Sequence, residues 1–177
     1  MAEQLPSPSH EALLLAEMED LGPGTGFTYE IQALVGRSPF FAEFTRADIE
    51  QFADYMRVYR ARQGQTIIHE GDTGDYMLLI IKGEVEILKK NLLGVQQEMA
   101  SVLPGMTLGE MSMIDGEPRF ASCMAVRETV FATLTRDNMA KIILEKPSLG
   151  AKVLVKLVTM LSQRLRQTSI RLLQYMK

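Results

Sequence analysis

The sequence predicts an α+β protein in which a small antiparallel β-barrel of the double-stranded β-helix (jelly-roll) kind is flanked by N-terminal helices and a long C-terminal helix. Three observations predict this fold class. Short apolar or alternating segments, separated by Gly, Asp and Pro turn residues, fill the middle of the chain. Helical periodicity precedes them, and a heptad-like pattern follows them. The chain of 177 residues, 46% of them hydrophobic, is long enough for one core.

Charge and cysteine content exclude several function classes. A net charge of −3 is not that of a protein with a broad nucleic-acid-binding surface. The single cysteine, Cys123, cannot form an internal disulfide, and no apolar run is long enough to span a bilayer. The first residues lack the basic region of a secretory signal. We therefore expect a cytoplasmic protein that binds neither nucleic acid nor a membrane.

Three regions are expected along the chain. Residues 1–26 form a flexible or partly helical arm, in which "HEALLLAEMEDL" lies between two segments rich in Pro and Gly. The apolar side of this stretch could dock on a partner or on the same protein, or the arm could be weakly ordered. Residues 27–147 hold the barrel with its N-terminal helices and the short helix that follows it. Residues 148–177 form a dimerisation helix.

Two short helices are expected before the barrel. The first has Ile31, Leu34 and Val35 on one face, and the second is capped by Thr45 and carries Ile49, Phe52 and Met56. Seven segments from Val58 to Thr135 are expected to be strands. They are "VYRA", "TIIHE", "YMLLIIKG", "EVEILKK", "QEMASVL", "ASCMAV" and "TVFATLT".

The C-terminal segment returns to helix. Thr135 is expected to cap a short helix that ends at Pro147, and a long helix follows from 148 to 176. Residues at alternating spacings of four and three form an a/d seam, which favours a parallel coiled coil between two subunits over a helix that lies on its own barrel. The seam consists of Leu154, Val158, Leu161, Leu165, Thr168, Leu172 and Tyr175.

The segment "LGEMSMIDGEPRFAS", residues 108–122, combines residue types that suit a ligand site. Gly109 allows a close approach of the backbone, and a helical turn after it would direct the amides of Met111 and Ser112 outward, where they can bind an anion. Arg119 can grip a phosphate with two parallel hydrogen bonds. An ionised Glu110 only accepts hydrogen bonds, and a sugar hydroxyl would supply one. Together these residues describe a site for a cyclic ribose phosphate.

A purely structural interpretation of the same segment is a buried ion pair between Glu110 and Arg119. The desolvation of two buried charges costs free energy that their attraction does not always recover. Such a pair would therefore be a poor choice for stability alone.

The same segment resembles the phosphate-binding cassette of the cyclic nucleotide-binding domain family, found in protein kinase A regulatory subunits, the bacterial catabolite activator protein and cyclic nucleotide-gated channels. In that cassette a Gly-Glu pair is followed about nine residues later by Arg and a strand of small residues, as at Glu110 and Arg119 here. The upstream "EGDTGDYMLLIIKGEVEIL" and the downstream "TLTRDNMAKIILEKPSL" are similar to neighbouring parts of the domain. The resemblance extends from about Phe27 to the C-terminus.

The resemblance implies roles for individual residues. Glu110 would accept a hydrogen bond from the ribose 2′-hydroxyl, Arg119 would pair with the phosphate, and the backbone amides of Ser112 and Ala121 would complete the phosphate site. In the catabolite activator group a Thr-Ser pair on the long helix contacts adenine, and Thr168 and Ser169 match that pair. Because Thr168 also lies on the seam, ligand in one subunit would be felt by the other.

Phe120 departs from the family pattern, in which a small or hydroxylated residue usually follows the arginine. Its ring could turn away, cap the pocket or partly fill it, and Ser122, two residues further, could supply a hydroxyl instead. A site selective for cGMP would usually have a hydroxyl directly after the arginine, so the sequence favours cAMP over cGMP.

Two functions remain open on this basis. The first is a cyclic nucleotide sensor that signals through helix rearrangement and a dimer interface, and the second is a ligand-free fold that acts as a dimeric docking module for another protein. No catalytic signature or cofactor motif accompanies the module, and the two histidines, His10 and His69, are too few for a metal enzyme of the cupin kind. Cys123 on an apolar strand is expected to be inert. In transcription factors of this family a DNA-binding domain follows where this chain ends, so either that domain was lost or the sequence stops before it. The output to an unidentified effector is expected to pass through the dimer or the arm.

Overall fold

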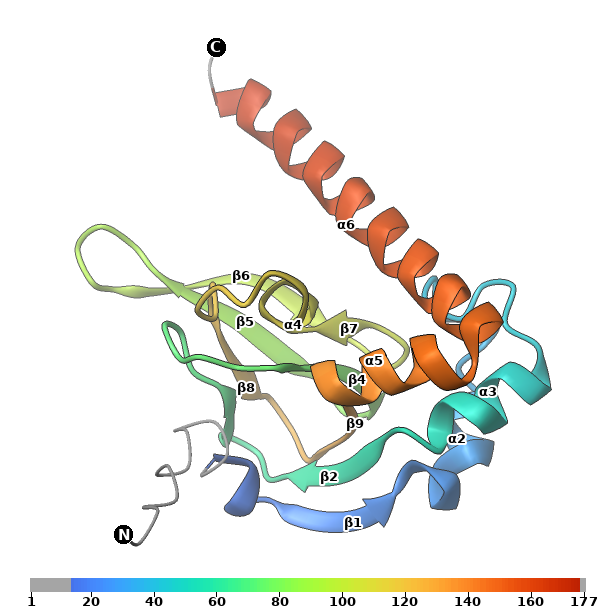
Figure 1. Ribbon diagram of the computed structural model, residues 1–177. Helices are drawn as coiled ribbons and strands as arrows, with labels where there is room; N and C mark the ends of the chain where they lie inside the picture. The colour runs from blue at the N-terminus through green and yellow to red at the C-terminus, as the bar shows by residue number, and fades with distance from the viewer. Residues whose placement is uncertain (1–13, 176–177) are drawn as a thin grey trace, which may run out of the picture.

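A computed structural model describes residues 14–175 and shows two antiparallel sheets packed in the jelly-roll manner, with helices at one end (Figure 1). One sheet has the order β1-β2-β9-β4-β7 and the other the order β3-β8-β5-β6. The two sheets form the expected jelly roll without closing into one continuous barrel. Their strands are β1 (Glu19–Pro23), β2 (Arg57–Ala61), β3 (Thr66–Ile68), β4 (Tyr76–Lys82), β5 (Val85–Lys90), β6 (Gln96–Val102), β7 (Thr107–Leu108), β8 (Ser122–Ala125) and β9 (Thr129–Thr135).

All seven segments expected to be strands are strands, and two further strands were not expected. β7 has only two residues and pairs with β4. β1 lies in the segment expected to be an arm, and it pairs antiparallel with β2, where Asp20 accepts hydrogen bonds from Arg57 at 2.5 and 2.8 Å. Residues 1–26 are therefore not an arm throughout, because this edge strand is fixed by pairing with a distant segment. Of the expected helical stretch before it, residues 14–16 are helical and residues 10–13 lie outside the described part of the chain.

The helices before the sheets build one end of the core. They are η1 (Gly24–Phe27), α2 (Thr28–Gln32) and α3 (Arg46–Ala53). α2 is shorter than expected, because Leu34 and Val35 lie in the turns that follow it. Thr45 caps α3 as predicted, in a reciprocal capping box with Asp48. Four phenylalanines pack together in the core at this end: Phe40, Phe41, Phe44 and Phe52.

The C-terminal helices are α5 (Arg136–Glu145) and α6 (Pro147–Tyr175). Thr135 caps α5 as predicted, and Pro147 is the first residue of α6, where a proline fits without loss of a hydrogen bond. Gly150 lets the two helices pack closely, since a Cβ atom there would lie 2.8 Å from the Cα atom of Ile143.

The two halves of α6 have different surroundings. In the first half Leu149, Val153 and Leu157 are buried in the core beside the phenylalanines. The C-terminal end of the second half extends beyond the rest of the domain (Figure 1). There the seam residues Leu165 and Leu172 are exposed. The helix therefore lies on its own domain at one end and leaves an apolar seam uncovered at the other, while the side chain of Tyr175 is outside the described part of the chain.

Candidate functional site

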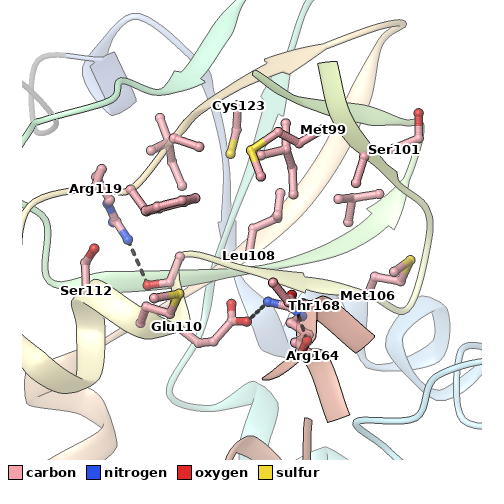
Figure 2. Close-up of a pocket in the computed structure, with 18 of the residues that line it drawn as sticks. Met99, Ser101, Met106, Leu108, Glu110, Ser112, Arg119, Cys123, Arg164 and Thr168 are labelled. Carbon is pink, nitrogen blue, oxygen red and sulfur yellow. Dashed lines mark hydrogen bonds and ion pairs between the residues drawn. The ribbon is translucent and has the colours of Figure 1, made fainter. Parts of the chain in front are cut away.

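A cavity of about 340 Å³ lies between the four-stranded sheet, the short helix α4 (Glu110–Asp115) and α6. Eight of the ten residues predicted for the site line this single cavity, and Figure 2 shows how several of them converge. These eight are Gly109, Glu110, Met111, Ser112, Arg119, Phe120, Ala121 and Thr168. Residues from β3, β5 and β6 complete the apolar wall, among them Ile68, Ile87 and Met99.

Gly109 is the N-cap residue that directly precedes α4. Its φ of 76° lies in the left-handed region, which favours glycine. A Cβ atom at this position would lie 2.6 Å from Nη1 of Arg119, closer than any real Cβ contact. Any larger residue would therefore strain the backbone and displace the guanidinium.

Arg119 forms the cationic wall of the cavity. It is only 3% exposed, and its guanidinium donates hydrogen bonds of 2.8 Å to the carbonyl oxygens of Gly109 and Tyr76. The same group lies 4.7 Å from the centre of the Tyr76 ring. These contacts fix the orientation of the guanidinium before any ligand arrives, as an anion site requires.

Glu110 is buried at the first position of α4, with 1% of its surface exposed. Its Oε1 atom pairs with Arg164 of α6, and Arg164 also donates a 2.8 Å hydrogen bond to the carbonyl of Thr107. Among the described residues nothing bonds to the Oε2 atom, although it is buried. Burial raises the pKa of Glu110, and the positive charges of Arg164 and Arg119 oppose that rise.

The interpretation of an ion pair between Glu110 and Arg119 is therefore wrong, because the carboxylate pairs with a residue of α6 instead. The second carboxylate oxygen remains available for a hydrogen-bond donor. A buried acceptor without a partner costs free energy in the empty site, and a ligand hydroxyl would remove that cost.

Phe120 stands at the rim without filling the cavity. Its side chain lines the cavity and is 54% exposed, and Nζ of Lys89 lies 4.3 Å from the ring centre. The sequence left three positions open for the ring, namely turned away, capping the pocket or partly filling it. The large exposure of a residue that lines the cavity fits the capping position.

Two of the predicted residues do not line the cavity. Ser122 is buried in β8, where its hydroxyl oxygen accepts a 2.9 Å hydrogen bond from the backbone N–H of Glu70. Ser169 is exposed on α6 and donates to the carbonyl of Leu165 at 2.9 Å. Thr168, by contrast, does line the cavity, with its hydroxyl donating to the carbonyl of Arg164 at 2.9 Å.

A family model for the cyclic nucleotide-binding domain matches residues 58–146, a span that contains the cassette, Arg119 and most strands of both sheets. This chain belongs to the cyclic nucleotide-binding domain family. The cyclic AMP receptor protein of Thermus thermophilus is 30% identical to it over 135 residues, which cover 76% of this chain and 61% of that protein. A cAMP-dependent protein kinase regulatory subunit from Aspergillus niger is 30% identical over 112 residues, which cover 63% and 26% respectively. The chain thus spans less than two thirds of the length of these relatives.

Solved structures of cyclic nucleotide-binding proteins have the same fold. A cyclic nucleotide-binding domain from Methylobacillus flagellatus superimposes with a TM-score of 0.80 at 38% identity, covering 89% of each chain. The catabolite activator protein of Thermus thermophilus superimposes with a TM-score of 0.71 at 30% identity, covering 76% of this chain and 62% of that one. The predicted jelly roll and its family are confirmed.

In this cyclic nucleotide-binding domain, one face of α6 lines the cavity, and only Thr168 on that face was predicted from the sequence. Arg164, Gln167 and Arg171 line the cavity together with Thr168. Their spacing relative to Thr168 places all four on one helix face, and this was the signal that could have found them. The partner of Arg164 is 54 residues away in sequence, so no local pattern predicts their contact.

Within residues 14–175 no group of three or more His, Cys, Asp and Glu side chains could hold a metal ion. His69 is exposed, and His10 lies outside this range. No described helix is both long and apolar enough to cross a membrane.

Proposed function

We propose that this protein is a cytoplasmic cyclic nucleotide sensor, acting by binding rather than by catalysis, with cAMP as its preferred ligand. The observation that carries the proposal is the unpartnered Oε2 atom of Glu110, buried in a cavity that the buried guanidinium of Arg119 also lines. A cyclic ribose phosphate offers a hydroxyl donor to the first and an anion to the second.

In the proposed complex each group has one role. Arg119 binds the phosphate, together with the backbone amides of Ser112 and Ala121, and Glu110 accepts from the ribose 2′-hydroxyl. Thr168 contacts the base from α6. The absence of a hydroxyl on Phe120 favours cAMP over cGMP. Two of the relatives, the cyclic AMP receptor protein and the cAMP-dependent protein kinase regulatory subunit, are named for cAMP.

Glu110 is also proposed to connect the ligand to the dimer helix. Its Oε1 atom already pairs with Arg164, so a hydroxyl on Oε2 would be held by the same carboxylate that holds α6. A ligand shifts a conformational equilibrium only by its different affinity for the two states. The shared carboxylate supplies such a difference, since the ribose hydroxyl adds a second donor to a group that already accepts from Arg164 of α6.

The second half of α6 is proposed to form a parallel homodimer through its exposed seam, with the effector protein reached through the dimer. Support comes from the exposure of Leu165 and Leu172 on a helix segment that projects from the domain (Figure 1). A parallel coiled coil would bring two Thr168 residues, and with them two cavities, to the same interface.

Replacement of Arg119 by alanine tests the function. Arg119→Ala is expected to abolish cAMP binding in isothermal titration while the protein still unfolds cooperatively, because the guanidinium serves the ligand. Arg127→Ala is the matched control: Arg127 carries the same charge and pairs with Glu84 at the surface, away from the cavity lining.

The proposal fails if the wild type binds no cyclic nucleotide and Arg119→Ala unfolds the protein. That result would give Arg119 a purely structural role and leave the fold as a docking module.

A further inference from the structure

We propose that Phe120 is a base-stacking residue, held in position by Lys89, and that it makes the cavity select cyclic nucleotides with a purine base. The inference rests on the proposed function, since it assigns a partner to the base of the same ligand. It concerns the one cassette residue that departs from the family pattern.

The ring of Phe120 is fixed by its neighbours. Nζ of Lys89 lies 4.3 Å from the ring centre, a cation–π contact. The same ammonium donates to the carbonyl oxygen of Phe120 at 2.5 Å and to Oε1 of Glu70 at 2.8 Å. Three contacts therefore hold Lys89 against one face of the ring, and they brace the residue that follows Arg119.

The other side of the ring is available to a ligand. Phe120 lines the cavity and is still 54% exposed, although Lys89 covers part of it. Ile87 and Met99 contribute apolar surface to the same cavity. An aromatic face beside aliphatic side chains suits a flat heterocycle, and Lys89 is not among the residues that line the cavity.

The neighbouring groups place the base near this ring. In the proposed complex Arg119 takes the phosphate and Glu110 the ribose, so the base extends toward the remaining apolar lining. Stacking of a base on an aromatic side chain contributes about 1–3 kcal/mol. A purine offers two fused rings to Phe120 where a pyrimidine offers one, so the contact favours purine ligands.

The alternative is that the ring obstructs the cavity. The two possibilities predict opposite changes in the affinity of Phe120→Ala for cAMP. If Phe120 stacks on the base, Phe120→Ala weakens cAMP binding by about 5- to 150-fold. If the ring obstructs entry, the same substitution strengthens binding. Because the side chain is largely exposed, its removal is expected to leave thermal unfolding nearly unchanged.

The experiment is isothermal titration of the full chain and its variants with cAMP and with cyclic CMP. Phe120→Leu keeps apolar bulk without an aromatic face, and it is expected to lose most of the affinity that Phe120→Ala loses. The preference for cAMP over cyclic CMP is expected to fall in both variants.

A second pair of variants tests the role of Lys89 in positioning. Lys89→Gln is expected to weaken cAMP binding by about 2- to 5-fold through the loss of the cation–π contact. Lys90→Gln is the matched control, because it removes the same charge one residue away, and the exposed side chain of Lys90 contacts no described residue by hydrogen bond or ion pair. If Lys89→Gln and Lys90→Gln weaken cAMP binding equally, the loss comes from the charge alone, and the positioning role of Lys89 is overturned.

The outcomes separate the two proposals. Binding of cAMP by the wild type with equal or tighter binding by Phe120→Ala overturns the stacking role and leaves the sensor function intact. If the wild type binds neither cAMP nor cyclic CMP, both the sensor function and the stacking role are overturned. Weaker binding of cAMP by Phe120→Ala and Phe120→Leu, with a smaller loss for cyclic CMP, supports the stacking role.

Discussion

Gly109 carries two separate constraints, its left-handed backbone angle and its closeness to Arg119. Gly94, at the β5–β6 turn, has nearly the same angle, with φ of 77° against 76°, and open space where a Cβ atom would lie. The two glycines therefore separate backbone strain from crowding of the guanidinium.

Gly109→Ala is expected to destabilise the protein by more than Gly94→Ala, which costs about 1 kcal/mol from strain alone. It is also expected to weaken cAMP binding, because its Cβ atom would displace Nη1 of Arg119. Urea unfolding and isothermal titration of both variants measure these effects. Equal losses of stability and unchanged affinity in both variants would show that the contact with Arg119 does not matter.

Glu110 gives the stability a definite dependence on pH. Burial raises the pKa of Glu110 above its ordinary value of 4.5, so the folded protein holds this proton more tightly than the unfolded chain. The associated stability is present below that ordinary value and is lost as the pH rises through the raised pKa. Above this window the ionised carboxylate remains buried at a cost.

Glu110→Gln lacks this titration. Its free energy of unfolding, relative to that of the wild type, is therefore expected to increase from acidic to neutral pH. Urea unfolding of both proteins across that range measures the difference. A difference that stays constant with pH would contradict the raised pKa.

At the scale of elements, α4 is tied to the C-terminal helices at both ends. Glu110 at its start pairs with Arg164 of α6. At its end the guanidinium of Arg136, the first residue of α5, donates 2.7 Å hydrogen bonds to the carbonyl oxygens of Ser112 and Met113. A cation at these carbonyls also complements the helix dipole. Movement of this six-residue helix on ligand binding would therefore be transmitted to both α5 and α6.

The seam of α6 is tested by two residues of equal exposure. Leu172 lies on the seam and Ile170 lies off it, and each is 59% exposed. Leu172→Glu is expected to convert a dimer to a monomer in sedimentation equilibrium, because it places two carboxylates in the apolar seam. Ile170→Glu is expected to leave the dimer intact. A monomeric wild type, or dimers in both variants, would contradict the proposed interface.

At the scale of the whole molecule, the sequence predicts elements whose pattern is local. The seven expected strands carry alternating or apolar runs, and Thr45 and Thr135 carry their own capping signals. β7 escapes prediction because it has only two residues, and β1 because its segment, EDLGP, carries no alternating apolar pattern. Each is defined by a distant partner, β4 and β2 respectively. Local composition around them indicates only turns.

The site divides in the same way. Residues 109–121 are contiguous, so their spacing alone brought the carboxylate and the guanidinium into one hypothesis. The pairing of Glu110 with Arg164 required the fold, because α6 reaches the cassette only after crossing its own core. The alternative ion pair of Glu110 with Arg119 was therefore wrong, while the hypothesis that put both residues in one site agrees with the cavity that they both line.

Isothermal titration of the wild-type protein with cAMP decides whether the cavity binds a cyclic nucleotide. We expect saturable binding with a Kd on the order of micromolar or tighter, equivalent to about 8 kcal/mol of binding free energy. Binding of cGMP is expected to be weaker. If a protein that unfolds cooperatively gives no heat of binding with either ligand, the cavity is not a cyclic nucleotide site.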